Sequence, residues 1–184
     1  MEVPRLETER LLLREWREED LDAYARMYAD PEVTRFLGGP ATREQAWRHI
    51  ALQIGHWQLR GYGQWVLERR EDGRFLGRAG LWRPEGWPGL EVGWTLRRDA
   101  WGAGYATEAA RVAIGWARET LGAGELLSII DPGNATSERV ARRLGMTPDA
   151  PGELLGKPVV IWRLENAKAP PERGFRRCGP ACPG

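Results

Sequence analysis

A glycine-rich turn in the middle of the chain has the residue types needed to bind a charged small molecule. It runs from Trp101 to Ala109 with the sequence WGAGYATEA, and it follows a short apolar segment, Glu91–Leu96. Glycine and alanine let the backbone approach a ligand closely, and the first N–H groups of a helix have no partners within that helix. These N–H groups and the helix dipole favour an anion. The turn therefore predicts a site for a phosphate-bearing small molecule.

Two familiar phosphate sites fit this turn poorly. A P-loop needs Gly-Lys-Ser/Thr, whereas Tyr105 and Ala106 follow Gly104, so that alternative fails. A dinucleotide site places its glycines directly after a strand, within repeated βαβ units. Here residues 97–100 intervene, and Asp131 after the next apolar segment is the one feature in favour of a dinucleotide.

Composition limits the classes of partner. The chain has 184 residues, enough for one domain, and its 42% hydrophobic and 29% charged residues are typical of a soluble globular protein. A net charge of +1 gives no argument for nucleic acid. The charged N-terminus does not resemble a signal peptide, and no apolar run approaches the ~20 residues of a membrane span. We therefore expect a cytoplasmic protein that binds no membrane.

The few metal-ligating side chains do not predict a metal site. The two cysteines, Cys178 and Cys182, lie near the C-terminus, and the chain has only two histidines, His49 and His56. The histidines are two helical turns apart, and we expect both to be surface residues. We expect no bound metal.

Hydrophobic periodicity predicts the elements that hold the turn. Thr42–Gln45 fits a capping box at the start of one helix, and Asp30-Pro31 ends the helix before it. We expect strands at residues 10–14, 64–69, 75–81, 91–96, 126–130 and 159–164, and helices before residue 30 and at about 42–60, 107–121 and 137–144. This order, βααβββαβαβ, indicates one mixed α/β domain at residues 6–165. Residues 166–184 are rich in Pro, Gly and Arg, and we expect a disordered tail there.

The segment Trp101–Ala106 resembles the pyrophosphate-binding loop of the GNAT superfamily of acyl-CoA-dependent N-acetyltransferases. That loop has the pattern Gln/Arg-x-x-Gly-x-Gly/Ala; Gly104 and Ala106 match it, while Trp101 stands where Gln or Arg is commoner. The longer run WGAGYATEA is typical of the branch that includes ribosomal-protein N-terminal alanine acetyltransferases. Three further segments resemble that branch, in its order: LETERLLLR at residues 6–14, GWTL at 93–96 and NATSERVARRLGM at 134–146.

The resemblance covers roughly residues 6–165, and it implies a fold and a co-substrate. The fold would be a mixed, mostly antiparallel sheet of six to seven strands flanked by helices. This sheet would splay between its fourth strand, 91–96, and its fifth, 126–130, where the pantetheine arm of acetyl-CoA inserts. Backbone groups of Trp94 and Leu96 would pair with pantetheine. The residues expected around the pyrophosphate are Gly102, Ala103, Gly104, Ala106 and Thr107. Dimers are common in this family.

The resemblance also implies roles for three polar residues of the segment 134–146. Asn134 would lie near the pantetheine, with a plain turn or helix-cap residue as the alternative. Ser137 would protonate the departing thiolate, with helix capping again the alternative. Arg139 would reach the phosphates of CoA or remain a solvated charge.

Glu91 is the candidate general base, because several family members carry a catalytic carboxylate on this strand. The alternative is a structural strand glutamate. Strand alternation puts Glu91, Gly93 and Thr95 on one face, but it does not say whether that face lines the acceptor site.

These residues together predict direct transfer of an acetyl group from acetyl-CoA to a primary amine. The branch resemblance favours a protein N-terminal α-amino group, whose pKa of ~7.7–8.0 makes it easier to deprotonate than a lysine at ~10.4. A small-molecule amine such as an aminoglycoside, polyamine or amino acid is the second expectation. A non-catalytic acyl-CoA-binding module is the third.

Overall fold

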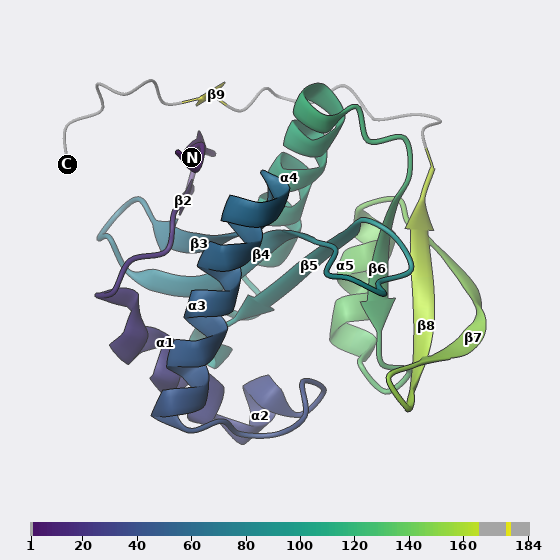
Figure 1. Ribbon diagram of the computed structural model, residues 1–184, viewed down its shortest axis with the longest axis horizontal. Coiled ribbons are helices and arrows are strands. Elements are labelled where there is room, and N and C mark those ends of the chain that lie inside the picture. Colours follow the sequence, from purple (N-terminus) through teal and green to yellow (C-terminus); the bar gives the residue numbers. More distant parts are fainter. Residues whose placement is uncertain (1, 166–175, 178–184) are drawn as a thin grey trace.

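A nine-stranded sheet runs through the centre of the molecule (Figure 1). The computed structural model describes residues 2–165 and 176–177. The strand order is β7-β8-β6-β5-β4-β3-β2-β1-β9, and every neighbouring pair is antiparallel except β5–β6. The strands are β1 (Leu6–Glu7), β2 (Leu11–Arg14), β3 (Gln64–Arg69), β4 (Phe75–Trp82), β5 (Glu91–Leu96), β6 (Leu126–Ile130), β7 (Thr147–Leu154), β8 (Lys157–Leu164) and β9 (Arg176–Arg177).

Helices cover both faces of the sheet. Figure 1 shows α1, α3 and α4 along its β2–β5 half and α5 beside β6. The helices are α1 (Asp20–Ala29), α2 (Pro31–Thr34), α3 (Arg43–Arg60), α4 (Tyr105–Leu121) and α5 (Ala135–Arg143), with a short 3-10 helix at Arg98–Ala100. Among these, no helix is long and apolar enough to cross a membrane in the part of the chain that is described.

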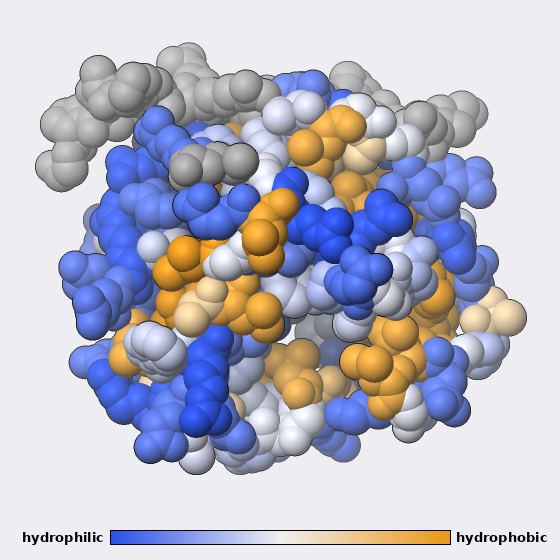
Figure 2. Space-filling model, in the orientation of Figure 1, coloured by the Kyte–Doolittle hydropathy of each residue, from blue (hydrophilic) through white to orange (hydrophobic). Residues whose placement is uncertain are grey.

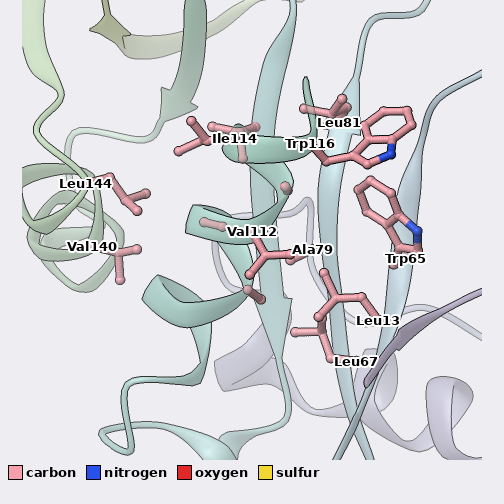
Figure 3. Packing of buried hydrophobic residues seen from close by; sticks show 14 of the residues in the cluster. Leu13, Trp65, Leu67, Ala79, Leu81, Val112, Ile114, Trp116, Val140 and Leu144 are labelled. Carbon is pink, nitrogen blue, oxygen red and sulfur yellow. The ribbon is translucent and has the colours of Figure 1, made fainter. Parts of the chain in front are cut away.

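The main core lies between α4 and the sheet. Alternate residues of β2–β4 point into it, because side chains of a strand alternate between its two faces (Figure 3). They meet the apolar stripe of α4 and the buried side of α5, and Figure 3 labels Leu13, Trp65, Leu67, Ala79, Leu81, Val112, Ile114, Trp116, Val140 and Leu144. A second cluster packs α1 and α3 against the other face, around Tyr24, Tyr28, Ile50, Val66 and Phe75. The two faces of these strands therefore pack against different helices, α4 and α5 on one side and α1 and α3 on the other.

Local signals placed most element ends correctly. The capping box of α3 is confirmed: the Thr42 hydroxyl accepts from the Gln45 N–H at 3.3 Å, and the Gln45 side chain accepts from the Thr42 N–H at 2.8 Å. Gly61 ends this helix in the left-handed conformation. Helix α4 begins at Tyr105, two residues earlier than the apolar periodicity alone indicated.

The sheet has nine strands rather than six or seven. Sequence reasoning predicted six strands and missed β1, β7 and β9; the longest of these three, β7, contains Pro148 and Pro151 and lacks apolar alternation. It lies at the edge of the sheet, where proline is tolerated because one side of the strand has no partner, and its register shifts between the two prolines. Of the expected tail, residues 166–175 and 178–184 lie outside the described residues, and so do both cysteines. Arg176–Arg177 pair with β1.

The sheet splays between β5 and β6, which are the predicted fourth and fifth strands. Their register consists of the single pair Glu91–Leu127, where the Leu127 N–H donates to the Leu90 carbonyl at 2.9 Å. Neighbouring pairs of similar length, such as β6–β8, keep five residues in register. The two strands therefore diverge after Glu91, and the splay that the resemblance implied is confirmed.

Candidate active site

The splay leaves backbone groups of β5 without a strand partner. The Arg97 N–H donates to the Leu76 carbonyl of β4 at 2.8 Å, so the odd-numbered residues of β5 turn their N–H and C=O groups toward β4. The even-numbered residues turn theirs toward β6. The Val92 carbonyl accepts from the Ser128 hydroxyl at 2.5 Å, and the Leu96 carbonyl accepts from the Trp101 indole at 2.9 Å. Trp94 lies between them, so its N–H and C=O face the open splay.

The glycine-rich turn forms an anion-binding helix start. Gly102 (φ 78°) and Gly104 (φ 86°) adopt left-handed conformations that a side chain would strain. Gly104 is the N-cap residue of α4 and has no side chain to cap it. The first hydrogen bond into the helix runs from the Glu108 N–H to the Gly104 carbonyl. The N–H groups of residues 105–107 therefore have no partner within the helix and suit an external anion.

Thr107 and Arg10 complete the surroundings of this turn. The buried Thr107 hydroxyl oxygen has no hydrogen-bond partner among residues 2–165 and 176–177. Arg10 donates to the Ala103 carbonyl at 2.9 Å, pairs with Glu108, and lies 4.6 Å from the centre of the Tyr105 ring. Sequence reasoning missed this role for Arg10, although the segment 6–14 carried the signal.

A cleft of about 380 Å³ opens beside the splay, between the α2–α3 side and the β7–β8 side. Figure 2 shows a hollow in this part of the face. Of the predicted site residues, the cleft brings together Glu91, Trp94, Asn134 and Ser137. Leu96, the glycine-rich turn and Arg139 are not part of its lining. The splay and the turn thus form one region, and the cleft forms a second region that meets it at Glu91 and Trp94.

Glu91 stands half-buried where these two regions meet. Its carboxylate accepts a hydrogen bond from the Trp87 indole at 2.7 Å. Burial raises the pKa of Glu91 to about 7, against the opposing effects of hydrogen bonds from Trp87 and the Ile129 backbone and of the charge of Arg78. Gly93 and Thr95 also line the cleft, so this face of β5 does border it. A carboxyl group with a pKa near 7 has the acidity that suits a general base at neutral pH.

The start of α5 brings Asn134 and Ser137, from the segment 134–146, to the cleft. The Asn134 side-chain oxygen accepts from the Ser137 N–H at 3.0 Å, which makes Asn134 the N-cap. This cap uses the oxygen of the Asn134 amide and leaves its NH₂ as the group to offer a ligand. Ser137 lies at the third position of the helix, so its hydroxyl is not the cap. Arg139 is exposed and donates to the Thr136 hydroxyl at 3.1 Å.

The prediction that both histidines lie on the surface is wrong. His56 is buried, donates from Nδ1 to the Tyr62 carbonyl at 2.8 Å, and stacks on Trp82 with ring centres 4.4 Å apart. His49 lies half-buried in the cleft wall beside the Tyr24 hydroxyl. Burial and the nearby charge of Arg78 lower the pKa of His49 to about 3, so it is neutral at pH 7. His49 therefore faces the cleft rather than solvent, whereas His56 packs against Tyr62 and Trp82 outside the cleft lining.

Arg78 is the functional candidate that sequence reasoning missed. It lies on β4 opposite Thr95, on the strand face that lines the cleft, and it is buried. Its guanidinium donates to the Tyr28 hydroxyl at 3.2 and 2.8 Å and to the side-chain oxygen of Gln64. An arginine within an otherwise apolar strand was the available signal, but nothing local says what lies opposite it.

Comparisons with known proteins agree with this geometry. Residues 10–147 match the model of the acetyltransferase (GNAT) domain family. The Bacillus subtilis protein YkkB is 30% identical over 170 residues, which cover 88% of this chain and 96% of that protein. An acetyltransferase from Agrobacterium tumefaciens has a similar structure (TM-score 0.81, 33% identity, 90% and 96% of the two chains). A putative ribosomal-protein-serine acetyltransferase from Vibrio cholerae shares the fold (TM-score 0.76, 18% identity, 88% and 97%).

The chain belongs to the GNAT acetyltransferase family. It is an N-acetyltransferase, and the fold implies acetyl-CoA as its co-substrate. The open backbone of Trp94, the left-handed glycines and the exposed helix start all fit that molecule. Among the described residues, no cluster of three or more His, Cys, Asp or Glu could hold a metal ion.

Proposed function

We propose that this enzyme acetylates a primary amine held in the cleft, and that a protein N-terminal α-amino group is the leading acceptor. The motif run WGAGYATEA supports the choice of acceptor, because it is typical of the ribosomal-protein branch. The Vibrio cholerae protein of the same fold carries a ribosomal-protein-serine acetyltransferase name. The observation that carries the proposal is the position of Glu91, whose raised pKa of about 7 occurs where the splay meets the cleft.

Residues of the splay and the turn would hold the co-substrate. Backbone groups of Trp94 and Leu96 would pair with the pantetheine arm, with the Asn134 amide beside it. The pyrophosphate would lie on residues 102–107, and Arg139 would contact a phosphate. When bound, acetyl-CoA supplies the thioester carbonyl that the amine attacks.

Glu91 would take the proton of the acceptor amine, directly or through one water. A free α-amino group has a pKa of ~7.7–8.0, so a base with a pKa of about 7 is well matched to it. Ser137, on the other wall, would give a proton to the departing thiolate. Backbone N–H groups along the splayed edge of β5 would stabilise the negative charge that develops on the carbonyl oxygen. Holding amine and thioester together would supply much of the rate.

A small-molecule amine is the second candidate acceptor, and the size of the cleft favours it. A volume of about 380 Å³ is at the lower end of small-molecule pockets. Phe36 and Leu37 from one segment and Leu154 and Leu155 from another line it. Such a cleft admits a small amine or the first residue of a peptide.

An acceptor screen with detection of the released thiol tests the proposal. The purified full chain is incubated with acetyl-CoA and with N-terminal peptides, free amino acids or polyamines. Acceptor-dependent release of CoA, with acetylated peptide seen by mass spectrometry, is the expected result. Turnover only with small amines would shift the assignment to the second acceptor. Tight binding of acetyl-CoA without turnover on any amine would contradict catalysis and favour a binding module.

A further inference from the structure

Arg78 is a buried cation whose hydrogen-bond partners are all neutral. The hydroxyl of Tyr28 and the amide oxygen of Gln64 accept from it, and the hydroxyl of Tyr24 lies close by. Within residues 2–165 and 176–177, no Asp or Glu forms an ion pair with it. A guanidinium keeps its proton even when buried, so this group carries a full positive charge into the cleft.

The charges around the cleft do not cancel that of Arg78. Glu91 is the carboxyl group whose charge it influences, and at neutral pH Glu91 is only partly ionised. At the mouth, the exposed Lys157 adds a second positive charge, and Asp131 accepts a hydrogen bond from the Gly133 N–H at 2.8 Å. Charged groups buried in proteins are normally paired or bound to a ligand, since an unpaired buried charge is costly. Among the described residues, no carboxylate forms a hydrogen bond or ion pair with Arg78, whose hydrogen-bond acceptors are the Tyr28 hydroxyl and the Gln64 amide.

Gly93 forms the part of the cleft wall between the Gln64 amide, which accepts from Arg78, and the proposed base, Glu91. The amide of Gln64 accepts from Arg78 through its oxygen, and its nitrogen points to the space above Gly93. A side-chain carbon on Gly93 would stand 3.1 Å from that nitrogen and 3.5 Å from a carboxylate oxygen of Glu91. A side chain at this position would therefore crowd the Gln64 amide, and glycine keeps the β5 face between Gln64 and Glu91 clear of a side chain.

A buried polar atom without a hydrogen-bond partner among the described residues also belongs to a residue that lines the cleft. Gln53 of α3 lines the cleft and is 1% exposed, and its side-chain oxygen has no hydrogen-bond partner among the described residues. A buried oxygen without a donor is destabilising until a ligand supplies one. The cleft therefore presents an unpaired cation and an unpaired acceptor, which a molecule with both an anionic group and N–H groups would satisfy.

We propose that Arg78 binds a carboxylate on the acceptor, so that this enzyme selects amines that carry an acidic group close to the amine. This inference rests on the proposed acetylation of an amine in the cleft. The carboxylate would come from a free amino acid or from an acidic side chain at the start of a peptide. In both, the amine would lie on the Glu91 side of Gly93 and the carboxylate on the Arg78 side.

The first experiment uses the wild-type enzyme and matched acceptors, so it does not depend on any variant folding. A free amino acid is compared with its amide and with the amine left after decarboxylation, and an N-terminal Asp peptide with its Asn counterpart. We expect kcat/KM to be about 10- to 100-fold higher for the carboxylate-bearing member of at least one set, as the loss of one charge-assisted pairing implies. The set that shows the preference identifies the source of the carboxylate. Equal values, or a preference for the neutral member in every set, would overturn the proposal.

The second experiment assigns the preference to Arg78. In Arg78→Gln the ratio of kcat/KM between the carboxylate-bearing acceptor and its neutral counterpart should fall to about one, chiefly through a rise in KM for the carboxylate-bearing acceptor. Arg83→Gln is the control, because it removes one exposed positive charge near the same strand end. A preference that survives in folded Arg78→Gln would contradict the role of Arg78.

A binding measurement separates this proposal from the proposed function. Calorimetry compares the binding of an N-acetylated amino acid and of its amide to the wild type and to Arg78→Gln. If no amine is turned over but the acid binds at least about tenfold more tightly through Arg78, the acetyltransfer proposal fails and the carboxylate site stands. If amines are turned over and the acid and amide bind equally, the carboxylate site fails and the proposed function stands.

Discussion

Two buried arginines on nearby strands of this sheet are satisfied in opposite ways. Arg14 of β2 pairs with Asp20 at 2.7 Å and with Glu68 at 2.6 Å, and it also donates to the Glu15 carbonyl. Arg78 of β4 has only neutral oxygens. Both groups stay charged, so the difference lies in their counter-charges. Arg14 is complete within the protein and ties the start of α1 to the sheet, whereas Arg78 is left for something that enters the cleft.

The same contrast separates Glu68 from Glu91. Glu68 lies in the ion-paired cluster of Arg14, while Glu91 accepts from an uncharged indole and has a pKa raised to about 7 by burial. Perturbed, incompletely paired groups in a cleft are typical of functional sites, and fully paired groups are typical of structural ones. Changes to the Arg14 cluster should therefore reduce stability, and changes in the cleft should reduce activity.

The largest effect should follow from Arg14→Met. This change takes the paired arginine away from the buried carboxylate of Asp20 and the half-buried carboxylate of Glu68, so we expect the free energy of unfolding to fall by about 3–5 kcal/mol in urea denaturation. The matched control is Arg17→Met, which removes an exposed partner of Glu15 and should cost less than about 1 kcal/mol. Equal losses for the two variants would show that the Arg14 cluster is not a structural ion pair.

Glu91→Gln should give the largest loss of activity. We expect kcat/KM to fall about 100-fold, because the base that receives the proton of the amine is removed. The base must be ionised, so wild-type kcat/KM should rise with pH up to about 7 and be lost as the pH falls through that value. The variant should lack this rise.

The exposed Glu85 supplies the control for this change. Its side chain is 99% exposed, and Glu85→Gln should keep both the rate and the pH profile. A Glu91→Gln enzyme that keeps the wild-type rise near pH 7 would contradict the assignment of the base.

Ser137→Ala should lower turnover about tenfold, which corresponds to about 1.4 kcal/mol in the activation free energy. The cap of α5 is made by the Asn134 side chain and the Ser137 N–H, so alanine leaves the helix start intact. Circular dichroism and thermal unfolding should show no change. Thr136→Ala at the neighbouring exposed position is the control, and equal turnover in the two variants would exclude Ser137 as the proton donor.

Arg78→Met should have the smallest effect on stability. It removes hydrogen bonds to neutral groups, each contributing about 1 kcal/mol, and it also removes the cost of burying an unpaired charge. We expect the free energy of unfolding to change by less than about 1.5 kcal/mol in the same urea measurement used for Arg14→Met. A fall in the free energy of unfolding as large as that of Arg14→Met would mean that the two arginines stabilise the fold to the same extent, which contradicts the proposed difference.

Sequence patterns located the half of the site that binds the co-substrate. The left-handed glycines at 102 and 104, the helix that starts at Tyr105, and the short apolar strand before them are all local features. Each depends on residues a few positions apart, so backbone preference and periodicity reveal it. The splay also followed from the resemblance, because the motifs on its two sides occur in the family's order.

The same patterns failed for the cleft side chains. Alternation along β5 grouped Glu91 with Gly93 and Thr95 but did not say what faces them. The histidines of α3 were assigned to the surface, since helical spacing does not reveal a polar cavity on the inner side of a helix. The edge strand β7 was missed because its prolines obscure the pattern of a strand.

The sequence by itself determined the fold family, the co-substrate that this family implies and the loop proposed to hold its phosphates, because these depend on short stretches of backbone geometry. Tertiary structure alone decided the character of the acceptor cleft. It brings Arg78 from β4, Gln53 from α3 and Glu91 from β5 to one space. The burial that raises the pKa of Glu91 and the neutral hydrogen-bond partners of Arg78 arise only when these distant segments pack together.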